Sequence, residues 1–481
     1  MAASPSSAHK PHIAIFPFMS KGHTIPLLHL AHLLHHRHLA SVITIFTTPL
    51  NSPFIRNFLS GVEPDIIELS FPGDFSDDLP PNIESTDCLP SMLLFLPFIQ
   101  AVKKLQPQFE LALKNLPTIN LLISDGFLGW AVDSSAKFGI PRMAFYGMGN
   151  FATTISRIVS INKPHKHVSS YDDPFTVTPF PHLKLTKADL SPPFDDPDSK
   201  GPLHDFVMEQ GIATMQSHGI IINSFSELDE IYLDYWNKNI GPKSWYVGPL
   251  CVMAAKHKIR LESTEHHQLA CMQWLDARSL SNRQVLYVAF GSQANVAPAQ
   301  LREIAVALEK SELDFLWVIK GDYYDDVIFG DFEEKVKDRG MVVHKWVDQM
   351  EILSHESVKG FMSHCGWNSV MESVVAGVPI LAWPMLAEQP LNAKFVVEEM
   401  KIGLRIRTRG KDIENEELVG RDHIEEMVRE LMVGEGGKEV ARNMKVLSEK
   451  ARVAMEYGGS SWTSLETLVS QVSSINTVPS D

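Results

Sequence analysis

The sequence predicts an α/β protein made of two doubly wound domains, each a parallel sheet with helices on both faces. Two observations lead to this expectation. Short apolar segments alternate with helical segments from residue 12 onward, and the same alternation starts again near Val285. Strands that alternate with helices favour parallel sheets covered on both sides. The length of 481 residues agrees with two or three domains, since one domain takes about 150 residues.

In the first half, an apolar segment at 12–18 predicts a strand, and residues 19–23 are expected to form the loop after it. Thr24 is predicted to cap the helix that follows, in which leucines recur at helical spacing. Further strands are expected at 41–47 and at 120–125, and the second of these ends in a carboxylate.

In the second half, the strand expected at 285–290 leads into Gly291-Ser292, and a helix is expected at 298–309. Two or three amphipathic helices are expected after Asn415. The other predicted strands are 315–319, 341–347, 358–362 and 379–383. The predicted organisation is a first domain at 1–250, a polar linker at 251–268, a second domain at 269–460, and a C-terminal helix at 461–481 that packs back on the first domain.

Two stretches, 71–97 and 162–202, are dense in proline, aspartate and serine and predict long irregular loops. Long loops in a compact enzyme are often binding loops or lids. We expect at least one of them to line a substrate pocket.

Composition excludes several classes of protein. The chain has 43 Lys+Arg and 58 Asp+Glu, a formal net charge of −15, which argues against a nucleic-acid binder because that function needs a concentrated basic face. No apolar run reaches the roughly 18 residues of a membrane span, and the N-terminus lacks the apolar core of a signal peptide. The 4 cysteines are widely spaced and suit neither a disulfide framework nor a CxxC metal site. We therefore expect a monomeric enzyme in the reducing cytoplasm.

The chemistry is expected beyond the carboxyl ends of the strands, where open α/β sheets bind their ligands. This rule selects His23, after the first strand, and Asp125, at the end of a later one. A histidine with a pKa of about 6.5 can take a proton from a hydroxyl, and a carboxylate on its other nitrogen would hold the required tautomer. The alternative is a loop histidine and an unrelated strand-end aspartate.

The run 363–369 is expected to bind an anion. Gly366 permits a tight turn, and the backbone N–H groups of the following helix start favour a phosphate. His364, Asn368 and Ser369 would add side-chain donors; the alternative is a helix cap with a core histidine. This half has neither G-x-G-x-x-G nor a Walker loop, which argues against hydride transfer with a nicotinamide and against P-loop phosphoryl transfer.

These residues belong to a block, Trp346 to Gln389, that closely resembles the signature box of plant family 1 UDP-glycosyltransferases. The block contains W-V-D-Q, H-C-G-W-N-S and a final E-Q. Outside it, Gly22-His23-x-x-Pro26, Ser124-Asp125 and Phe290-Gly291-Ser292 fall where the family has them. The resemblance covers nearly the whole chain and implies a GT-B fold, two Rossmann-like domains facing across a cleft.

The resemblance also implies roles for the matched residues. His23 is the general base, and Asp125 orients it. Trp346 stacks on the uracil, Gln349 contacts the nucleoside, and Glu372 accepts hydrogen bonds from the ribose hydroxyls.

The resemblance implies that two further groups of residues bind the rest of the donor. The diphosphate is held by Ser292, His364, Asn368 and Ser369. The sugar is contacted by Trp367, Glu388 and Gln389. The implied reaction is a direct displacement in which the acceptor oxygen attacks the anomeric carbon and inverts α to β. UDP leaves without a metal or other cofactor, because the helix N-terminus and His364 stabilise its charge.

UDP-glucose is the expected donor, since Gln389, rather than a histidine, resembles the glucose-using majority; galactose, xylose and glucuronate are the alternatives. The expected acceptor is a small lipophilic plant phenolic such as a flavonoid, with terpenoids or hormones as alternatives. Two alternative functions belong to other classes of protein: a catalytically silent UDP-sugar-binding protein on the same fold and a Rossmann oxidoreductase.

Three positions depart from the family pattern. Asp348 stands where many members have a proline before Gln349, so the turn expected beside the uracil base is expected to differ in shape. Glu388 replaces the commoner aspartate, which shifts a carboxylate expected to bind the sugar. Gly147 lies where some glucosyltransferases place a hydroxyl that reaches the 6-position of the sugar.

Other polar features are expected to play no part in the chemistry. Cys365 is expected to be a core thiol, and Lys21 a solvated loop residue. The histidines expected on a solvated helix face are His29, His32, His35, His36 and His38. The acidic pairs expected in solvated loops are 172–173, 195–196 and 325–326.

Overall fold

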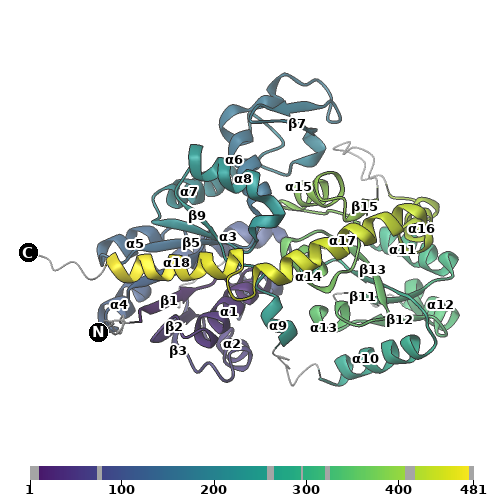
Figure 1. Cartoon of the computed structure of the whole chain (residues 1–481), viewed down its shortest axis with the longest axis horizontal. Helices are drawn as coiled ribbons and strands as arrows, with labels where there is room; N and C mark the ends of the chain where they lie inside the picture. The colour runs from purple at the N-terminus through teal and green to yellow at the C-terminus, as the bar shows by residue number, and fades with distance from the viewer. Residues whose placement is uncertain are drawn as a thin grey trace, which may run out of the picture. The chain divides into compact units, whose positions relative to one another are not determined.

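The computed structural model describes residues 10–72, 79–256, 265–293, 296–319, 326–406 and 418–475 (Figure 1). The chain forms two compact units. Unit 1 contains Met1–Gly147, Lys200–Met253 and Ala454–Asp481, and unit 2 contains Met148–Ser199 and Ala254–Val453. Each unit has one large parallel sheet with helices, and this confirms the predicted fold class.

The sheet of unit 1 has seven strands in the order β3-β2-β1-β4-β5-β8-β9. The two central strands, β1 and β4, are buried along their whole length, as expected for apolar strands of a parallel sheet. The strands are β1 (His12–Phe16), β2 (Val42–Thr47), β3 (Asp65–Glu68), β4 (Leu121–Asp125), β5 (Arg142–Tyr146), β8 (Gly219–Ile222) and β9 (Ser244–Tyr246). The helices are α1 (Lys21–His36), α2 (Ser52–Phe58), α3 (Phe95–Lys103), α4 (Gln106–Asn115), α5 (Ala131–Lys137), α7 (Pro202–Met215), α8 (Ser226–Asn239) and α18 (Ser460–Ile475).

Helix α1 begins earlier than predicted. Ser20 is its N-cap residue, so His23 lies in the first turn of the helix and not in a loop. Thr24 is inside the helix, where its hydroxyl donates to the carbonyl of Phe18 at 3.0 Å. The prediction that Thr24 caps the helix was wrong because the chain already turns at Ser20, whose N–H donates to the Phe18 carbonyl at 2.8 Å.

The sheet of unit 2 has six strands in the order β12-β11-β10-β13-β14-β15. The strands are β10 (Val285–Ala289), β11 (Asp314–Val318), β12 (Gly340–Val343), β13 (Val358–Ser363), β14 (Ile380–Ala382) and β15 (Gly403–Arg405). The helices are α6 (Asn150–Asn162), α10 (Glu265–Leu280), α11 (Pro298–Ser311), α12 (Asp326–Val336), α13 (Gln349–Leu353), α14 (Trp367–Ala376), α15 (Gln389–Lys394), α16 (Arg421–Val433) and α17 (Glu435–Ala454). Helix α9 (Val252–Lys256) precedes α10.

Helices cover both faces of the unit 2 sheet, because alternate residues of each strand point to opposite sides. Leu286 and Val288 face a core built with α11, α12 and α16. Val285 and Tyr287 of the same strand face a second core with α10 and α13. Figure 1 shows α11 beside α16 and α12.

The stretch 162–202 is ordered and is not the irregular loop that the sequence predicts. It contains an antiparallel hairpin, β6 (Phe175–Val177) and β7 (Phe180–Leu185), between the short 3-10 helices η3 (Pro164–His167) and η4 (Lys187–Asp189). The other predicted loop, 71–97, contains η1 (Thr86–Cys88), η2 (Met92–Leu94) and the start of α3, and its residues 73–78 lie outside the described residues.

Residues 148–199 group with unit 2, although the sequence places them in the range of the first domain. Phe151 stacks on Phe395 with ring centroids 4.7 Å apart. Buried Asp189 pairs with Lys394 at 3.2 Å and with Arg405 at 3.1 Å. The grouping depends on these contacts between segments distant in sequence, which composition does not reveal.

The C-terminal helix α18 belongs to unit 1 and packs beside β9 (Figure 1). The hydroxyl of Ser461 donates to the carbonyl of Gly248, and the guanidinium of Arg37 lies 3.5 Å from the ring centroid of Trp462. Residues 476–481 of the expected helix and residues 257–264 of the expected linker lie outside the described residues.

Two of the histidines expected on a solvated face of α1 are buried. His29 is 4% exposed beside Phe58, and a ring nitrogen of His32 lies 2.9 Å from the Phe58 carbonyl oxygen. Burial lowers the pKa of His29 to about 3, so its ring is neutral. The prediction was wrong for these two because residues 26–34 are all buried, so α1 is covered on more than one side.

The described residues contain neither a helix long and apolar enough to cross a membrane nor a group of three His, Cys, Asp or Glu side chains placed to hold a metal.

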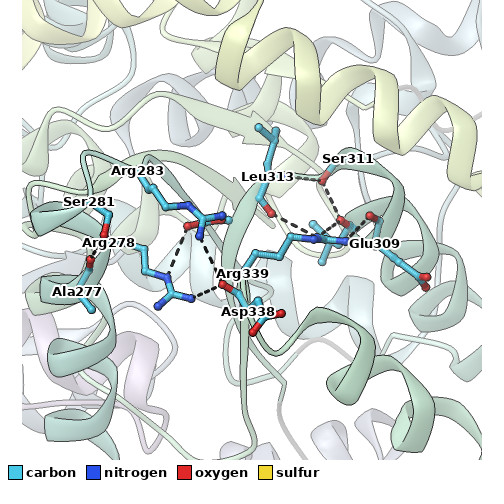
Figure 2. Close-up of polar contacts among 11 residues, drawn as sticks. Ala277, Arg278, Ser281, Arg283, Glu309, Ser311, Leu313, Asp338 and Arg339 are labelled. Atoms are coloured by element: carbon cyan, nitrogen blue, oxygen red, sulfur yellow. Dashed lines mark hydrogen bonds and ion pairs between the residues drawn. The ribbon is translucent and has the colours of Figure 1, made fainter.

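A charged network lies at the amino ends of the unit 2 strands (Figure 2). Asp314, the first residue of β11, is buried and forms ion pairs with Arg278 and Arg283. Arg339, just before β12, donates to the carbonyl of Leu308 at 3.1 Å. The network joins α10, α11 and the sheet at the end opposite to the one where such sheets bind ligands, so we interpret it as structural.

Candidate active site

In unit 1, His23 and Asp125 follow the two strands at which the strand order reverses. β1 and β4 are parallel neighbours, and Phe16 pairs with Ser124 in register. Asp125 ends β4, and His23 lies in the first turn of α1, directly after β1. The sheet therefore brings the two predicted residues together at a topological switch point, where α/β sheets bind ligands.

The pair is hydrogen-bonded. Nδ1 of His23 lies 2.9 Å from Oδ2 of Asp125, and Oδ1 of Asp125 accepts from the backbone N–H of Phe127 at 2.9 Å. The carboxylate is 1% exposed, whereas the His23 side chain is 27% exposed. When Nδ1–H donates to the buried carboxylate, Nε2 carries the lone pair, which is the arrangement that a general base needs.

Aromatic rings surround His23. The rings of Phe18 and Phe127 lie 5.4 Å and 4.8 Å from it, and Phe127 also contacts Phe206. The imidazole is thereby held between apolar groups, with Asp125 as a polar partner. The arrangement suits a base that works beside an apolar substrate.

In unit 2, the predicted anion-binding residues also lie at a switch point. β10 and β13 are parallel neighbours, with Ala289 paired to Ser363. Gly291-Ser292 follows β10, and His364 follows β13. Two loops with predicted donor-binding residues therefore leave the sheet side by side.

Two glycines make room for the His364 ring. A Cβ at Gly291 would lie 2.6 Å from Nε2 of His364, and a Cβ at Gly366 would lie 2.5 Å from the same atom. Gly291 also has φ +78°, a conformation that favours glycine. Burial lowers the pKa of His364 to about 4, so at neutral pH it can bind a phosphate as a neutral hydrogen-bonding group.

Helix α14 starts at this loop. Gly366 is its N-cap residue, and Asn368 and Ser369 lie in its first turn. The preceding Cys365 has φ +62°, an uncommon conformation for a non-glycine residue. Burial raises the pKa of its thiol to about 12, which agrees with a core thiol and not with a nucleophile.

Gln349, Ser369 and Glu372 form one hydrogen-bonded cluster. Nε2 of Gln349 donates to Oγ of Ser369 at 2.8 Å and to Oε2 of Glu372 at 2.6 Å. Loss of water around the carboxyl group raises the pKa of Glu372 to about 7, with a further contribution from the nearby charge of Asp348. The structure thus brings together three residues with implied nucleoside, phosphate and ribose roles.

The departure at Asp348 has a local structural role. Its carboxylate caps α13 by accepting from the N–H of Glu351 at 3.0 Å, while its own N–H donates to Gln268 at 2.7 Å. The pattern Asp-x-x-Glu, a known signal for a helix start, could have revealed this cap from the sequence.

The residues expected to contact the sugar lie in two places. The Trp367 side chain is 2% exposed, and a Cβ at Gly149 would lie 2.7 Å from its ring. Glu388 is the N-cap residue of α15 and accepts from Asn392 at 3.3 Å. Oε1 of Gln389 accepts from the N–H groups of Met385 and Leu386 at 3.0 Å and 2.9 Å, so it shapes its own loop.

Two further predicted donor residues follow strands of the unit 2 sheet. Trp346 follows β12, and Ser292 follows β10; both are partly buried. His23 and Asp125 belong to unit 1, whereas all the predicted donor residues belong to unit 2.

Sequence reasoning missed Arg142, the first residue of β5. It is 2% exposed, and its guanidinium donates to the hydroxyl of Ser124 and to the carbonyl of Asp125. An arginine that opens an otherwise apolar strand is the signal that could have revealed it.

Comparison with known proteins identifies the family. Residues 239–418 match the family model described as UDP-glucoronosyl and UDP-glucosyl transferase. The chain is 45% identical to UDP-glycosyltransferase 90A1 of Arabidopsis thaliana over 97% of each chain. It is 36% identical to the scopoletin glucosyltransferase of Nicotiana tabacum over 96% of this chain and 98% of that one.

Solved structures agree in fold. The crystal structure of Glycyrrhiza uralensis UGT73P12 complexed with glycyrrhetinic acid 3-O-monoglucuronide has 30% identity and a TM-score of 0.88, with 97% of this chain and 96% of that chain covered. Medicago truncatula UGT71G1 complexed with UDP-glucose has 25% identity and a TM-score of 0.79, with 98% and 100% covered. The resemblance, the GT-B fold and the enzyme class predicted from the sequence are thus confirmed, and the chain belongs to the plant UDP-glycosyltransferases.

Proposed function

We propose that this enzyme is an inverting O-glycosyltransferase that transfers glucose from UDP-glucose to a hydroxyl of a small lipophilic phenolic, such as a flavonoid. The observation that carries the proposal is the 2.9 Å contact between Nδ1 of His23 and the buried carboxylate of Asp125. Relatives named as flavonoid and scopoletin glucosyltransferases support the choice of glucose and of a phenolic acceptor.

In this proposal His23 takes the acceptor proton on Nε2 as the acceptor oxygen bonds to the anomeric carbon. The bond from that carbon to the β-phosphate oxygen breaks, UDP leaves, and the configuration changes from α to β. Asp125 stabilises the imidazolium that forms. The apolar rings around His23 exclude water and favour a lipophilic acceptor.

The donor is proposed to bind unit 2. Trp346 stacks on the uracil, Gln349 contacts the nucleoside, and Glu372 accepts from the ribose. The diphosphate group is proposed to be held by Ser292, His364, Asn368, Ser369 and the N-terminus of α14. These neutral donors and the helix dipole support a leaving group stabilised without a metal.

The sugar is proposed to contact Glu388 and Gln389, together with the backbone of Trp367. The Trp367 ring packs inside unit 2, so its main chain is the part proposed to reach the sugar.

A donor and acceptor screen tests the proposal. Purified enzyme is incubated with UDP-glucose, UDP-galactose, UDP-xylose and UDP-glucuronate against flavonoids, scopoletin and glycyrrhetinic acid, and products are identified by mass spectrometry and NMR. The expected product is a β-O-glucoside of a phenolic. His23→Ala should lose about a thousandfold or more in kcat, and His36→Ala, an exposed histidine of the same helix, should not.

Three results would redirect the proposal. Full activity of His23→Ala would remove the assigned base. UDP binding without turnover of any acceptor would indicate a binding protein. Turnover of glycyrrhetinic acid alone would favour non-phenolic acceptors, the second candidate class, which is supported by the similarity to UGT73P12 complexed with glycyrrhetinic acid 3-O-monoglucuronide.

We further propose a cytosolic location, supported by the wide spacing of the four cysteines in the sequence, which suits no disulfide framework. Fractionation of plant cells that express a tagged chain tests this location.

A further inference from the structure

We propose that Arg142 is a positioning residue for the general base: its buried guanidinium holds the turn that carries Asp125, and its charge favours the neutral form of His23. The inference rests on the proposed role of His23 in the transfer reaction. Arg142 touches neither His23 nor, in this proposal, a substrate; it acts through Asp125.

The guanidinium of Arg142 is bound to the turn after β4. Its Nε donates to Oγ of Ser124 at 2.6 Å. One terminal nitrogen, Nη2, donates to the carbonyl oxygens of Asp125 at 3.2 Å and Leu128 at 3.4 Å. The side chain thus spans the turn from the residue before Asp125 to three residues after it.

The other terminal nitrogen anchors this turn to a helix. Nη1 donates to Oγ of Ser217 at 2.6 Å and to the carbonyl of Ala213, at the end of α7, at 3.5 Å. The carboxylate of Asp125 is bound separately by the N–H of Phe127. Backbone and side chain of Asp125 are therefore fixed from different directions, and the carboxylate is held at one distance from His23.

The positive charge of Arg142 is not neutralised by a close carboxylate. All five acceptors are hydroxyl or carbonyl groups, and no ion pair of Arg142 with a carboxylate occurs among the described residues. Burial lowers the pKa of Arg142 to about 10, and the charge of Asp125 opposes this change. The side chain is therefore a buried cation at neutral pH. Neutral donors could bind the same hydroxyl and carbonyl groups, so the hydrogen bonds alone do not explain why a charged arginine is buried here.

The charge acts on His23 across Asp125, whose backbone carbonyl binds Arg142 and whose carboxylate binds His23. Protonated His23 would place a second cation on Asp125, so Arg142 disfavours that form and keeps Nε2 able to accept a proton. Other titratable groups near the two side chains include Tyr146 on β5, whose hydroxyl lies 2.7 Å from that of Thr214, and Lys21 and Asp87. Asp87 accepts from the backbone N–H of Lys21 at 2.7 Å.

The test compares Arg142→Lys, which keeps the charge, with Arg142→Met, which removes it. The readout is the titration midpoint of the His23 ring in substrate-free protein, followed by NMR with ¹³C-labelled histidine and assigned with His23→Gln. We expect the midpoint in Arg142→Met to lie about one pH unit above that in Arg142→Lys. Arg37→Met, which removes another buried arginine of unit 1, should lower the melting temperature and leave the midpoint unchanged.

Kinetics provide the second readout. In both variants kcat should fall about tenfold, with KM for UDP-glucose within about twofold of wild type, because the proposed donor residues belong to unit 2. The acidic limb of the pH–kcat profile should move to higher pH only in Arg142→Met.

Equal His23 midpoints in the two variants would overturn the proposal, and this measurement needs no turnover. An inactive wild type would instead contradict the proposed function. If Arg142→Met does not fold, the midpoint in Arg142→Gln replaces it in the comparison with Arg142→Lys. A kcat in Arg142→Lys equal to that of an active wild type would also overturn the positioning role.

Discussion

Glu372 changes its charge in the pH range of an ordinary assay, because its pKa is raised to about 7 mainly by loss of water around the carboxyl group. If the ribose binds the carboxylate, protonation below pH 7 competes with the donor, and the apparent affinity falls as pH falls. We expect KM for UDP-glucose to rise about tenfold between pH 8 and pH 6. Steady-state kinetics at fixed, saturating acceptor measure this change.

Two variants identify the group responsible. Glu372→Gln cannot titrate at this position, so its KM for UDP-glucose should be higher than that of the wild type and should not change with pH. Asp348→Asn keeps a side chain able to cap α13 but removes the charge that raises the pKa of Glu372, so the rise in KM should begin at lower pH. A pH-dependent KM in Glu372→Gln would assign the titration to another group.

Gly291 is predicted to be essential for donor binding because a side chain there meets His364. A Cβ would lie 2.6 Å from Nε2 of the ring, and the backbone has φ +78°. Gly291→Ala should weaken UDP binding about tenfold or more, since the ring must move, and should cost about 1–2 kcal/mol of stability from strain. Calorimetric titration with UDP and thermal unfolding measure the two effects.

Gly139→Ala is the matched control for this prediction. Gly139 has φ +65°, but a Cβ there meets no atom within 4 Å. The variant Gly139→Ala should therefore lose a similar amount of stability to Gly291→Ala but bind UDP with wild-type affinity. Similar UDP affinities in the two variants would mean that the contact with His364 is unimportant for the donor.

At the scale of elements, α15 links the proposed sugar site to the segment 148–199. Its last residue, Lys394, is 6% exposed and pairs with Asp189 at 3.2 Å, while its N-cap residue is Glu388. Asp189→Asn would leave Lys394 and Arg405 without their shared buried carboxylate. We expect a loss of about 3 kcal/mol in unfolding free energy and a rise of about threefold in KM for UDP-glucose, measured by denaturation and kinetics.

An exposed ion pair provides the comparison. Asp234 and Lys238 lie 2.9 Å apart on α8, and both side chains are exposed, so Asp234→Asn should change stability by less than about 0.5 kcal/mol. Wild-type stability in Asp189→Asn would show that the 189–394–405 cluster does not hold α15.

The strands that carry the site were predictable because they are buried on both faces and consist mainly of apolar residues, as in 12–16, 121–125 and 285–289. The start of α1 could not be predicted, because Ser20 and Thr24 are equally suitable N-cap residues. Only the turn at Phe18 in the folded chain selects Ser20. Strands β6 and β15 have three residues each and were missed because segments this short carry almost no periodic signal.

For the candidate site, the sequence predicted which residues take part but not which contacts they make. The strand-end rule and the signature box placed His23, Asp125 and Glu372, but hydrogen bonds such as that from Gln349 to Glu372 depend on side-chain packing. Arg142 escaped notice because its partners are two hydroxyls and three carbonyls, none of which has a sequence signature.

For the whole molecule, the restart of the strand pattern near Val285 revealed two similar sheets. It did not reveal that residues 148–199 group with unit 2, since this depends on contacts such as that of Phe151 with Phe395. The net charge of −15 is compatible with a diphosphate donor if, as proposed, a helix N-terminus and neutral side chains bind the phosphates.

The last described helix, α18, is predicted to be required for the stability of unit 1. Leu468 is 2% exposed within it, and Arg37 joins α1 to α18 through the ring of Trp462 and the carboxylate of Glu466 at 2.9 Å. Leu468→Ala should cost about 3 kcal/mol, because it removes a buried apolar side chain and leaves a cavity. Thr467→Ala, at an exposed position of the same helix, should cost less than about 0.5 kcal/mol.

Hydrogen exchange followed by mass spectrometry locates the effect. Because α18 packs beside β9, which pairs with β8, amide protection should fall in these two strands in Leu468→Ala. Protection in β10 and β13 should stay at the wild-type level, since these strands belong to unit 2. Equal loss of protection in both sheets would show that the two units unfold as one cooperative body, and α18 would then stabilise the whole enzyme and not unit 1 alone.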